Sequence, residues 1–214
     1  MDTNRRFGLA GVIVALAASA GLLVAPDLPA EMATHWNAAG EPDATLSKPI
    51  ALGLMPGLTA LLLGVLYVLP RVDPKGENIE RFRATYDWFV VGLAATLSVV
   101  HVGIVAYNLG YRFPFVSLVL VAVACLLYAA GVVLERAEQN WVVGIRTPWT
   151  LESEAVWERT HEVGASLFKL TALAVLLGAI FPQYSTLLLV GPLVVTTVVL
   201  TIYPYLLYRR LEAE

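Results

Sequence analysis

Six long apolar runs constrain the fold of this chain of 214 residues more than any other feature. A helix needs about 20 apolar residues to cross a hydrocarbon core roughly 30 Å thick, and each run is close to that length. The runs lack the two-residue alternation of a transmembrane β-strand, and a helix satisfies its own backbone in lipid. We therefore predict an all-α integral membrane protein, a bundle of six transmembrane helices. The predicted spans are residues 7–25, 50–69, 88–106, 115–134, 165–181 and 184–207.

The composition agrees with this class. Hydrophobic residues make up 58% of the chain and charged residues 14%, against about 45–50% and about 25% in soluble proteins. The net charge of −3 argues against direct nucleic-acid binding, which needs a basic surface. Cys125 is the single cysteine, which excludes a disulfide framework and a cysteine metal cluster.

The first apolar run also has a feature of a signal peptide, because Arg5 and Arg6 precede it. Its 19 residues exceed the roughly 7–15 residues of a signal-peptide core. We therefore expect it to remain in the mature protein as the first transmembrane helix.

The distribution of Lys and Arg predicts the orientation, because these residues accumulate in cytoplasmic connections. Eleven of them lie in one set of connections and two in the other. We expect a multi-pass protein of the cell membrane with both termini in the cytoplasm. The inner set is Arg5, Arg6, Arg71, Lys75, Arg81, Arg83, Arg136, Arg146, Arg159, Arg209 and Arg210, and the outer set is Lys48 and Arg112.

Two connections are too long for simple turns. The outer loop, residues 26–49, contains four prolines and is expected to be extended and rich in turns. The inner connection, residues 135–164, is expected to be irregular as far as Trp149 and then helical, with Thr150 as the N-cap. That helix is expected to continue into the fifth span. Residues 1–70 would form a helix pair with the outer loop and residues 71–214 a four-helix region, together one structural unit.

The inner connection contains the run NWVVGIRTPWT, residues 140–150. Gly144 permits backbone angles closed to other residues and Pro148 fixes one, so the pair indicates a shaped loop. Arg146 presents a planar fork suited to a carboxylate or a phosphate. One interpretation is a membrane-surface loop, with Arg146 on a lipid phosphate or on Glu152 or Glu154. The other is a loop that recognises a partner or closes a cavity.

Two clusters of side chains offer metal-ligating groups. Glu154, Glu158 and His161 share one face of the inner helix, and Glu-x-x-His is half of a carboxylate-bridged metal motif. That motif occurs once here, and such a site needs it twice, so ion pairs with neighbouring arginines are the alternative. The outer loop offers a second chelate or, alternatively, a hydrogen-bonded cap over the bundle: His35, Glu41 and Asp43. We predict no cofactor.

Two ionisable residues, His101 and Lys169, lie within the predicted spans. Lys169 is near the cytoplasmic end of its span, where its ammonium can reach the headgroups. No Gly-x-Ser-x-Gly motif and no pair of intramembrane acids is present, so we predict that the protein is not an enzyme. The alternative is a small-solute transporter or a metal-binding membrane enzyme that uses Glu154, Glu158 and His161.

Two stretches of the chain resemble the SdpI family of bacterial and archaeal membrane proteins. The inner stretch resembles the C-terminal SdpI region through Asn140, Trp141, Gly144, Ile145, Arg146, Thr147, Pro148, Trp149 and Thr150, followed by Trp157, Thr160, His161 and Gly164. The outer stretch resembles the domain of unknown function that often precedes that region, through Leu28, Pro29, His35, Trp36, Asn37, Gly40, Pro42 and Asp43.

The resemblance implies immunity to a secreted toxic peptide, the role of the family's best-known member. It also implies signal transduction, in which a cytoplasmic repressor is held at the membrane once the toxin is present. The expected partners are membrane lipid, the peptide outside and the repressor inside. The expected binding residues are His35, Trp36 and Asn37 outside, and Asn140, Gly144, Arg146, Thr147, Pro148, Trp149, Trp157 and His161 inside. A scaffold in which Arg146 holds a lipid phosphate is a further alternative.

Overall fold

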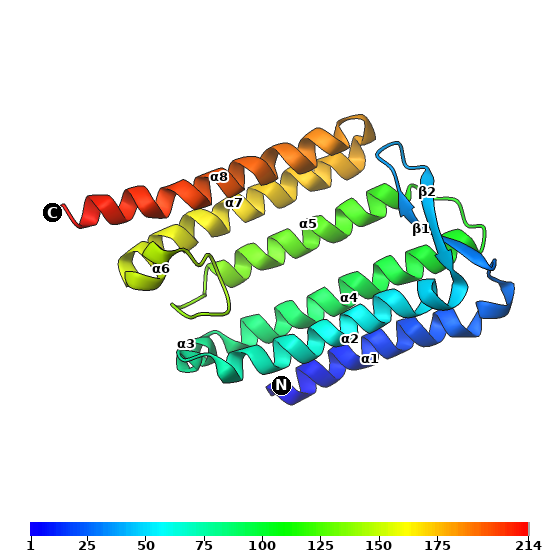
Figure 1. Ribbon diagram of the computed structural model, residues 1–214, viewed down its shortest axis with the longest axis horizontal. Helices are drawn as coiled ribbons and strands as arrows, with labels where there is room; N and C mark the ends of the chain where they lie inside the picture. The colour runs from blue at the N-terminus through cyan, green and yellow to red at the C-terminus, as the bar shows by residue number, and fades with distance from the viewer. Residues whose placement is uncertain (214) are drawn as a thin grey trace.

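The computed structural model describes residues 1–213, and six long helices dominate this part of the chain (Figure 1). Each contains an apolar stretch long enough to cross a membrane. The prediction of an all-α membrane protein with six transmembrane helices is therefore confirmed. The helices are α1 (Thr3–Leu23), α2 (Lys48–Val72), α4 (Arg83–Asn108), α5 (Phe115–Leu134), α7 (Glu154–Ile180) and α8 (Ser185–Leu211). Shorter elements are η1 (Ala25–Asp27), α3 (Gly76–Arg81), α6 (Pro148–Glu152) and η2 (Pro182–Tyr184).

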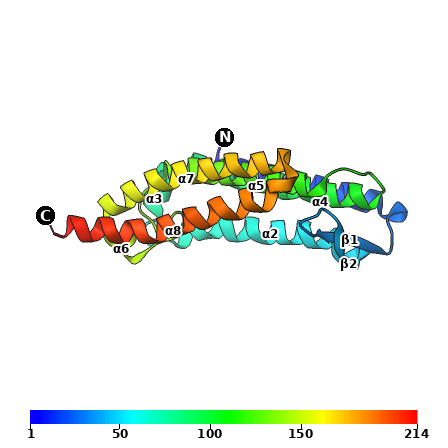
Figure 2. The same ribbon diagram turned by 90° about the horizontal axis from the view of Figure 1, so that it is seen from above.

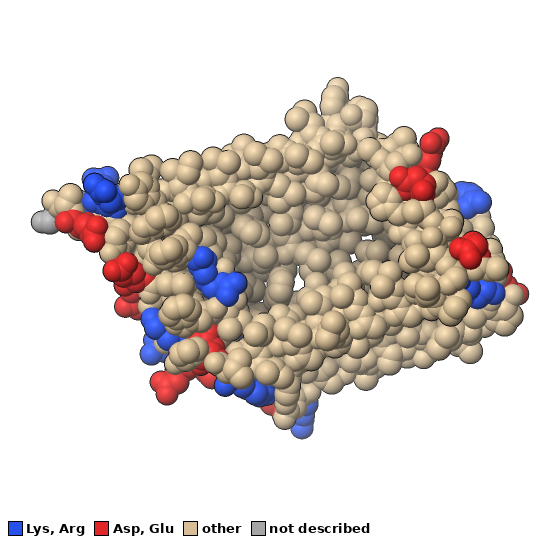
Figure 3. Space-filling view, viewed as in Figure 1, with Lys and Arg blue, Asp and Glu red and all other residues tan. Residues whose placement is uncertain are grey.

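The helices form a row with two flanking members. Helices α1, α4, α5 and α7 pack side by side in that order, α2 packs on α1 and α4, and α8 packs on α7. Figure 2 shows α2 and α8 on the same side of the row. The space-filling view shows a hollow between them, floored by the middle of the row (Figure 3). We call this hollow the trough.

Glycines let neighbouring helices of the row approach closely, as is common where membrane helices pack. A Cβ atom on Gly131 of α5 would lie 3.0 Å from the carbonyl oxygen of Ala165 in α7. A Cβ atom on Gly103 of α4 would lie 2.5 Å from Leu118 Cδ2 in α5. A larger residue at Gly131 would press on the backbone of α7, whereas at Gly103 the side chain of Leu118 would have to move.

The outer connection contains two strands that the sequence reasoning did not predict. Strand β1 (Glu31–Trp36) pairs antiparallel with β2 (Pro42–Ser47), with Glu31 opposite Ser47. The strands form because alternate residues of β1, Met32 and Trp36 among them, are buried against the helices while His35 faces outwards. The chain turns at Gly40, which has a φ of +82°. We call the two strands and their turn the outer hairpin.

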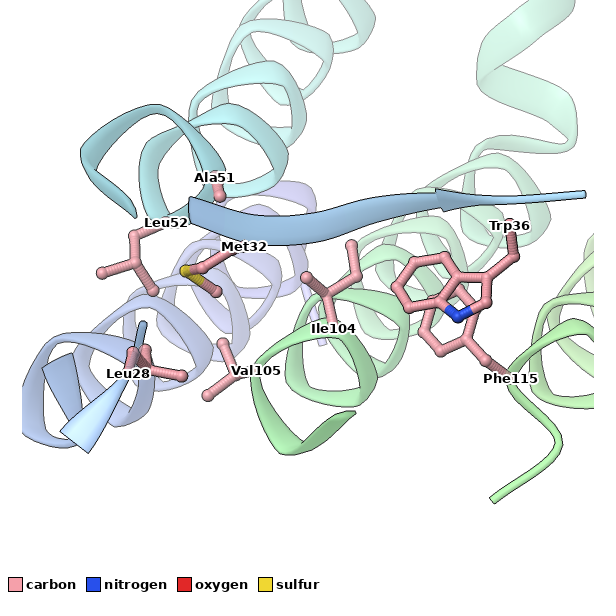
Figure 4. Close-up of a cluster of buried hydrophobic side chains, with 8 residues drawn as sticks. All are labelled: Leu28, Met32, Trp36, Ala51, Leu52, Ile104, Val105 and Phe115. Atoms are coloured by element: carbon pink, nitrogen blue, oxygen red, sulfur yellow. The ribbon is translucent and has the colours of Figure 1, made fainter. Parts of the chain in front are cut away.

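The outer hairpin is fastened to the helix ends by a buried apolar cluster (Figure 4). Asn108 of α4 adds polar contacts: its Oδ1 accepts from the amide of Ala33 at 2.8 Å, and its Nδ2 donates to the carbonyl of the same residue at 2.9 Å. One amide side chain thus occupies the place of a third strand. The cluster consists of Leu28, Met32, Trp36, Ala51, Leu52, Ile104, Val105 and Phe115.

The helix starts in the inner connection differ from the prediction. The N-cap of α6 is Thr147, whose side chain accepts from the amide of Thr150, and the N-cap of α7 is Ser153. The prediction that Thr150 is the cap is therefore wrong. Pro148 places the first helical residue earlier, because its fixed φ suits position N1. As predicted, α7 continues without interruption into the fifth span.

A buried ionic cluster joins the inner ends of α1 and α4. The carboxylate of Asp87 is fully buried and accepts from Arg83 Nε at 2.9 Å. It also accepts from Thr3 Oγ1 at 2.8 Å and from Arg6 Nη1 at 3.4 Å. A buried charge that lacked these partners would be strongly destabilising. The cluster therefore explains why α4 begins in polar sequence, five residues before the predicted span.

The two ionisable residues of the predicted spans, His101 and Lys169, have different surroundings. The ammonium of Lys169 donates to the carboxylate of Glu135 at the inner end of α5. His101 is buried against Gly21 of α1, and neither of its ring nitrogens has a hydrogen-bond partner within residues 1–213.

Candidate functional site

The inner loop is shaped by the side chain of Asn140, which is fully buried. Its Oδ1 accepts from the amides of Val142 and Val143 at 2.8 and 2.6 Å. Its Nδ2 donates to the carbonyls of Glu138 and Val143 at 2.7 and 3.0 Å. Two donors and an oxygen that accepts twice are the full capacity of an amide side chain. Asn140 is therefore a residue that builds the loop.

Gly144 brings the loop backbone into direct contact with α7. Its φ is +121°, and a Cβ atom there would lie 2.3 Å from His161 Nε2 and 3.1 Å from Trp157 Cη2. The loop thus lies on a surface made by two other residues of the predicted site. Any side chain at this position would push the loop away from α7.

His161 and Trp157 form that surface as a stacked pair, with ring centroids 3.9 Å apart. His161 Nε2 accepts from the amide of Ile145 at 3.0 Å, and its Nδ1 lies 2.8 Å from the carbonyl oxygen of Trp157. An amide can only donate and a carbonyl can only accept, so the proton is on Nδ1. Trp157 Nε1 in turn donates to the carbonyl of Ala137 at 2.7 Å.

Both ring nitrogens of His161 are thus used within the fold. Glu154 and Glu158 are exposed on the same helix. For His161 to bind a metal ion together with them, its Nε2 would have to give up the hydrogen bond from the loop. No group of three His, Cys, Asp or Glu side chains placed to hold a metal ion occurs among residues 1–213.

Thr147 and Thr150 close the other end of the loop. Thr150 is fully buried, and its hydroxyl lies 2.8 Å from the carbonyl oxygen of Ile145 and accepts from the amide of Thr147 at 2.8 Å. Trp149 packs against Tyr205 of α8, with ring centroids 5.1 Å apart. The loop therefore contacts α8 as well as α7.

Arg146 and Pro148 are the exposed inner residues of the predicted site, and Trp141, which was not predicted, is exposed beside them. The guanidinium of Arg146 donates to the carbonyl of Trp141 at 2.5 Å, and not to Glu152 or Glu154 as one interpretation of the sequence had it. The side chain of Trp141 is 51% exposed. These two residues can therefore contact a partner or a headgroup without any change in the loop.

The turn between α2 and α3, together with Asn78 of α3, also holds the loop, which the sequence reasoning missed. The amide of Trp141 donates to Asp73 Oδ2 at 2.9 Å, and Asn78 Nδ2 donates to the carbonyl of Gln139 at 2.7 Å. The ammonium of Lys75 donates to Gln139 Oε1. The sequence analysis used this turn only to count Lys and Arg residues for the prediction of the orientation. Its Asp-Pro pair, typical of turns, was the available signal.

The three outer residues of the predicted site differ in their surroundings. His35 is exposed, with its Nδ1 2.5 Å from Asp43 Oδ1. Trp36 is buried and stacks on Phe115 with ring centroids 3.7 Å apart. Asn37 Oδ1 accepts from two amides of the hairpin turn at 2.9 and 3.1 Å. Thus His35 is available for contacts, while its two neighbours fix the hairpin.

The outer and inner residues lie at opposite ends of the bundle, so they do not form one site (Figure 1). The trough lies between them. Its outer end is a cavity of about 410 Å³ that the outer hairpin lines together with α2, α4, α5 and α8. Its inner end is a cavity of about 290 Å³ lined by Val142, Val143, Gly144 and Ile145 of the loop together with helix residues.

Comparison with known proteins identifies two matched regions. Residues 136–204 match the model of the SdpI/YfhL protein family, and residues 12–60 match a domain of unknown function, DUF1648. The Immunity protein SdpI of Bacillus subtilis (strain 168) is 23% identical over 204 residues, which cover 95% of this chain and 96% of that protein. No solved structure matches the chain. The resemblance predicted from the sequence is confirmed: the C-terminal part of the chain is similar to the SdpI/YfhL family, and a region similar to DUF1648 precedes it.

Proposed function

We propose that this protein protects its host against a toxic peptide that acts at the membrane. The observation that carries the proposal is the similarity to the Immunity protein SdpI along nearly the whole of both chains. The inner loop supports it, because the residues that resemble the family signature are those that build the loop and seat it on α7.

The excess of Lys and Arg assigns the two faces, because positive residues collect on the cytoplasmic side. Both termini and the loop that contains Arg146 then face the cytoplasm, and the outer hairpin faces the exterior. A secreted peptide meets the hairpin first. His35 and Asp43 are the polar pair that the hairpin presents to it, whereas Trp36 is turned into the bundle.

A cytoplasmic repressor is the proposed partner of the inner face. Arg146 and Trp141 are exposed there. Beside the loop lies a polar cleft of about 410 Å³ whose lining includes Glu154, Glu158 and Glu162. Binding of the peptide outside would change the affinity for the repressor inside only if the peptide binds two arrangements of the bundle unequally. Helix α7, which begins in the inner connection and crosses the membrane, is the proposed carrier of that change.

The proposal is tested in a toxin-sensitive bacterial host exposed to culture supernatant that contains the toxic peptide. His35→Ala is expected to reduce survival, because it removes the polar pair from the outer hairpin. Arg112→Ala, an exposed arginine on the same face, is the matched control and is expected to protect like the wild type.

Arg146→Ala addresses the inner face in the same cells. It is expected to protect at first exposure but to lose the recruitment of cytoplasmic protein to the membrane, measured by quantitative mass spectrometry of membranes before and after exposure. Arg5→Ala is its exposed control. If His35→Ala and Arg146→Ala both behave like the wild type at equal abundance, the proposed roles of the two faces are wrong.

A further inference from the structure

A groove lies between the inner ends of α4 and α5, on a different face of the row from the trough. Its α5 side consists of Tyr128, Ala129 and Val132, whereas Ala130 and Val133 line the inner cavity of the trough. The two sets point in different directions because successive helical residues are about 100° apart. The groove has a volume of about 350 Å³, and neither α2 nor α8 contributes to its lining. We call this groove, which is therefore open to the membrane, the α4–α5 groove.

One end of the α4–α5 groove lies at headgroup depth. Arg136 follows shortly after Leu134, the last residue of α5, and Trp88 is 51% exposed on the α4 side. Arginines and exposed tryptophans near the ends of spans are typical of the membrane boundary. From Arg136 the groove follows α5 into the membrane as far as Tyr128, about 12 Å at the usual rise per residue. The groove thus has a charged end at the boundary and a mainly apolar part within the hydrocarbon.

The charge of Arg136 is not compensated within the described part of the chain. Its Nη1 donates to Thr85 Oγ1 at 2.9 Å, which holds the guanidinium across the end of the groove. It forms no ion pair within residues 1–213, because Glu135 beside it pairs with Lys169. Arg136 also borders the polar cleft beside the inner loop, but none of the carboxylates there is within ion-pair distance of it. The remaining donors of the guanidinium fork are therefore available, and their geometry suits a phosphate.

The lining also selects the kind of headgroup. It contains no Asp or Glu, so a headgroup amine would find no counter-charge within the groove. An anionic glycerophospholipid carries a phosphate without such an amine and, in the same molecule, an unbranched apolar chain for the space between Ala129, Val132 and Phe89.

We propose that the α4–α5 groove binds an anionic glycerophospholipid, with the phosphate on Arg136 and one acyl chain between α4 and α5. Because Arg136 leads into the inner connection, the bound lipid would hold the start of that connection at the membrane boundary. The site does not depend on the proposed immunity function.

Photolabelling tests the proposal. The purified full-length protein is placed in phosphatidylcholine vesicles that contain a trace of phosphatidylglycerol with a diazirine in one acyl chain, and labelled residues are identified by mass spectrometry after irradiation. Labelling of Ala129 and Val132 is expected to exceed that of the exposed residues Leu61 and Leu187 at least threefold. The same diazirine on phosphatidylcholine is expected to give no such excess. Added inorganic phosphate is expected to leave the labelling unchanged, because the site also requires the acyl chain.

Two pairs of variants make the test specific. Arg136→Gln is expected to lower the labelling of the groove by phosphatidylglycerol at least fivefold, whereas Arg71→Gln, the same change at an exposed arginine in the last turn of α2, is expected to leave it unchanged. Ala129→Phe fills the groove and is expected to lower the labelling of Val132 by a similar factor. Ala60→Phe makes that change at an exposed position of α2 and is expected to have no effect. Thermal unfolding of each variant shows that it is folded.

Three results would overturn the proposal. The first is labelling by phosphatidylglycerol that exceeds neither that of the exposed residues nor that by phosphatidylcholine, which would leave the groove to a helix of another protein. The second is labelling that Arg136→Gln and Ala129→Phe both leave at the wild-type level although these variants are folded. The third is loss of labelling on addition of inorganic phosphate, which would make Arg136 a site for a free anion.

Discussion

Gly144→Ala tests the central feature of the inner loop, its close seating on α7. The new Cβ atom would lie 2.3 Å from His161 Nε2, so ring or loop must move by about 1 Å to restore ordinary contact. That movement breaks the hydrogen bond from the Ile145 amide, which leaves a buried group unpaired at a cost of about 1–3 kcal/mol. An alanine at a φ of +121° adds about 1–2 kcal/mol of backbone strain.

These contributions predict that Gly144→Ala lowers the free energy of unfolding by about 2–5 kcal/mol. For a chain of this size that corresponds to a fall in Tm of roughly 5–15 °C. The measurement is thermal unfolding of the purified protein in detergent, with the amount of protein in the membrane as a second readout.

Two variants separate the steric effect from the strain. Gly40→Ala places alanine at a φ of +82° in the outer hairpin, where nothing lies within 4 Å of the new Cβ atom. It is expected to cost only the strain, about 1–2 kcal/mol. In a His161→Ala background, Gly144→Ala is expected to cost less than in the wild type, because the obstructing ring is gone. If Gly144→Ala lowers the Tm no more than Gly40→Ala, the loop does not lie on the Trp157–His161 pair as described.

Three further predictions concern other parts of the molecule. Asp87→Ala leaves Arg83 without its buried counterion and is expected to lower the free energy of unfolding by about 3–5 kcal/mol, measured by thermal unfolding; a loss below 1 kcal/mol would contradict the ionic cluster. Trp157→Phe leaves the carbonyl of Ala137 without its donor and is expected to cost about 1–3 kcal/mol in the same measurement, so an unchanged Tm would be inconsistent with this bond. In a background without Cys125, Arg146→Cys is expected to react with a membrane-impermeant maleimide only after the cells are opened, and reaction in intact cells would reverse the assigned orientation.

The six spans could be predicted because the property that defines them, a long apolar run, is local in the sequence. Their ends could not. Helix α4 begins at Arg83 because Asp87, Thr3 and Arg6 compensate the buried charges, and those contacts join residues more than 75 positions apart. A polar stretch before an apolar run looks the same in the sequence whether or not distant partners exist.

The outer hairpin was missed for a related reason. A two-stranded hairpin is marginal by itself, and this one depends on Asn108 and on the apolar cluster beneath it. The prolines that suggested an irregular loop lie where they do not interrupt the pairing, for example Pro42 at the start of β2.

In the inner loop, Gly144 and Pro148 correctly indicated a shaped backbone. The sequence analysis placed most of the signature residues in one binding set, but side-chain direction decides their roles. The side chains of Asn140, Thr150 and His161 point into the structure and form their hydrogen bonds within it. A motif in a single sequence does not distinguish residues that build a loop from residues that the loop presents.

The attachment of the outer hairpin to α4 through Asn108 has a mechanical consequence. The side chain belongs to the last residue of α4, and the same helix carries Asp87 near its opposite end, in the cluster that grips the start of α1. Helix α4 is 26 residues long, about 39 Å at the usual rise per residue. Because a helix of this length is stiff, a displacement of the hairpin would be transmitted along α4 to the ionic cluster at the other end of the bundle.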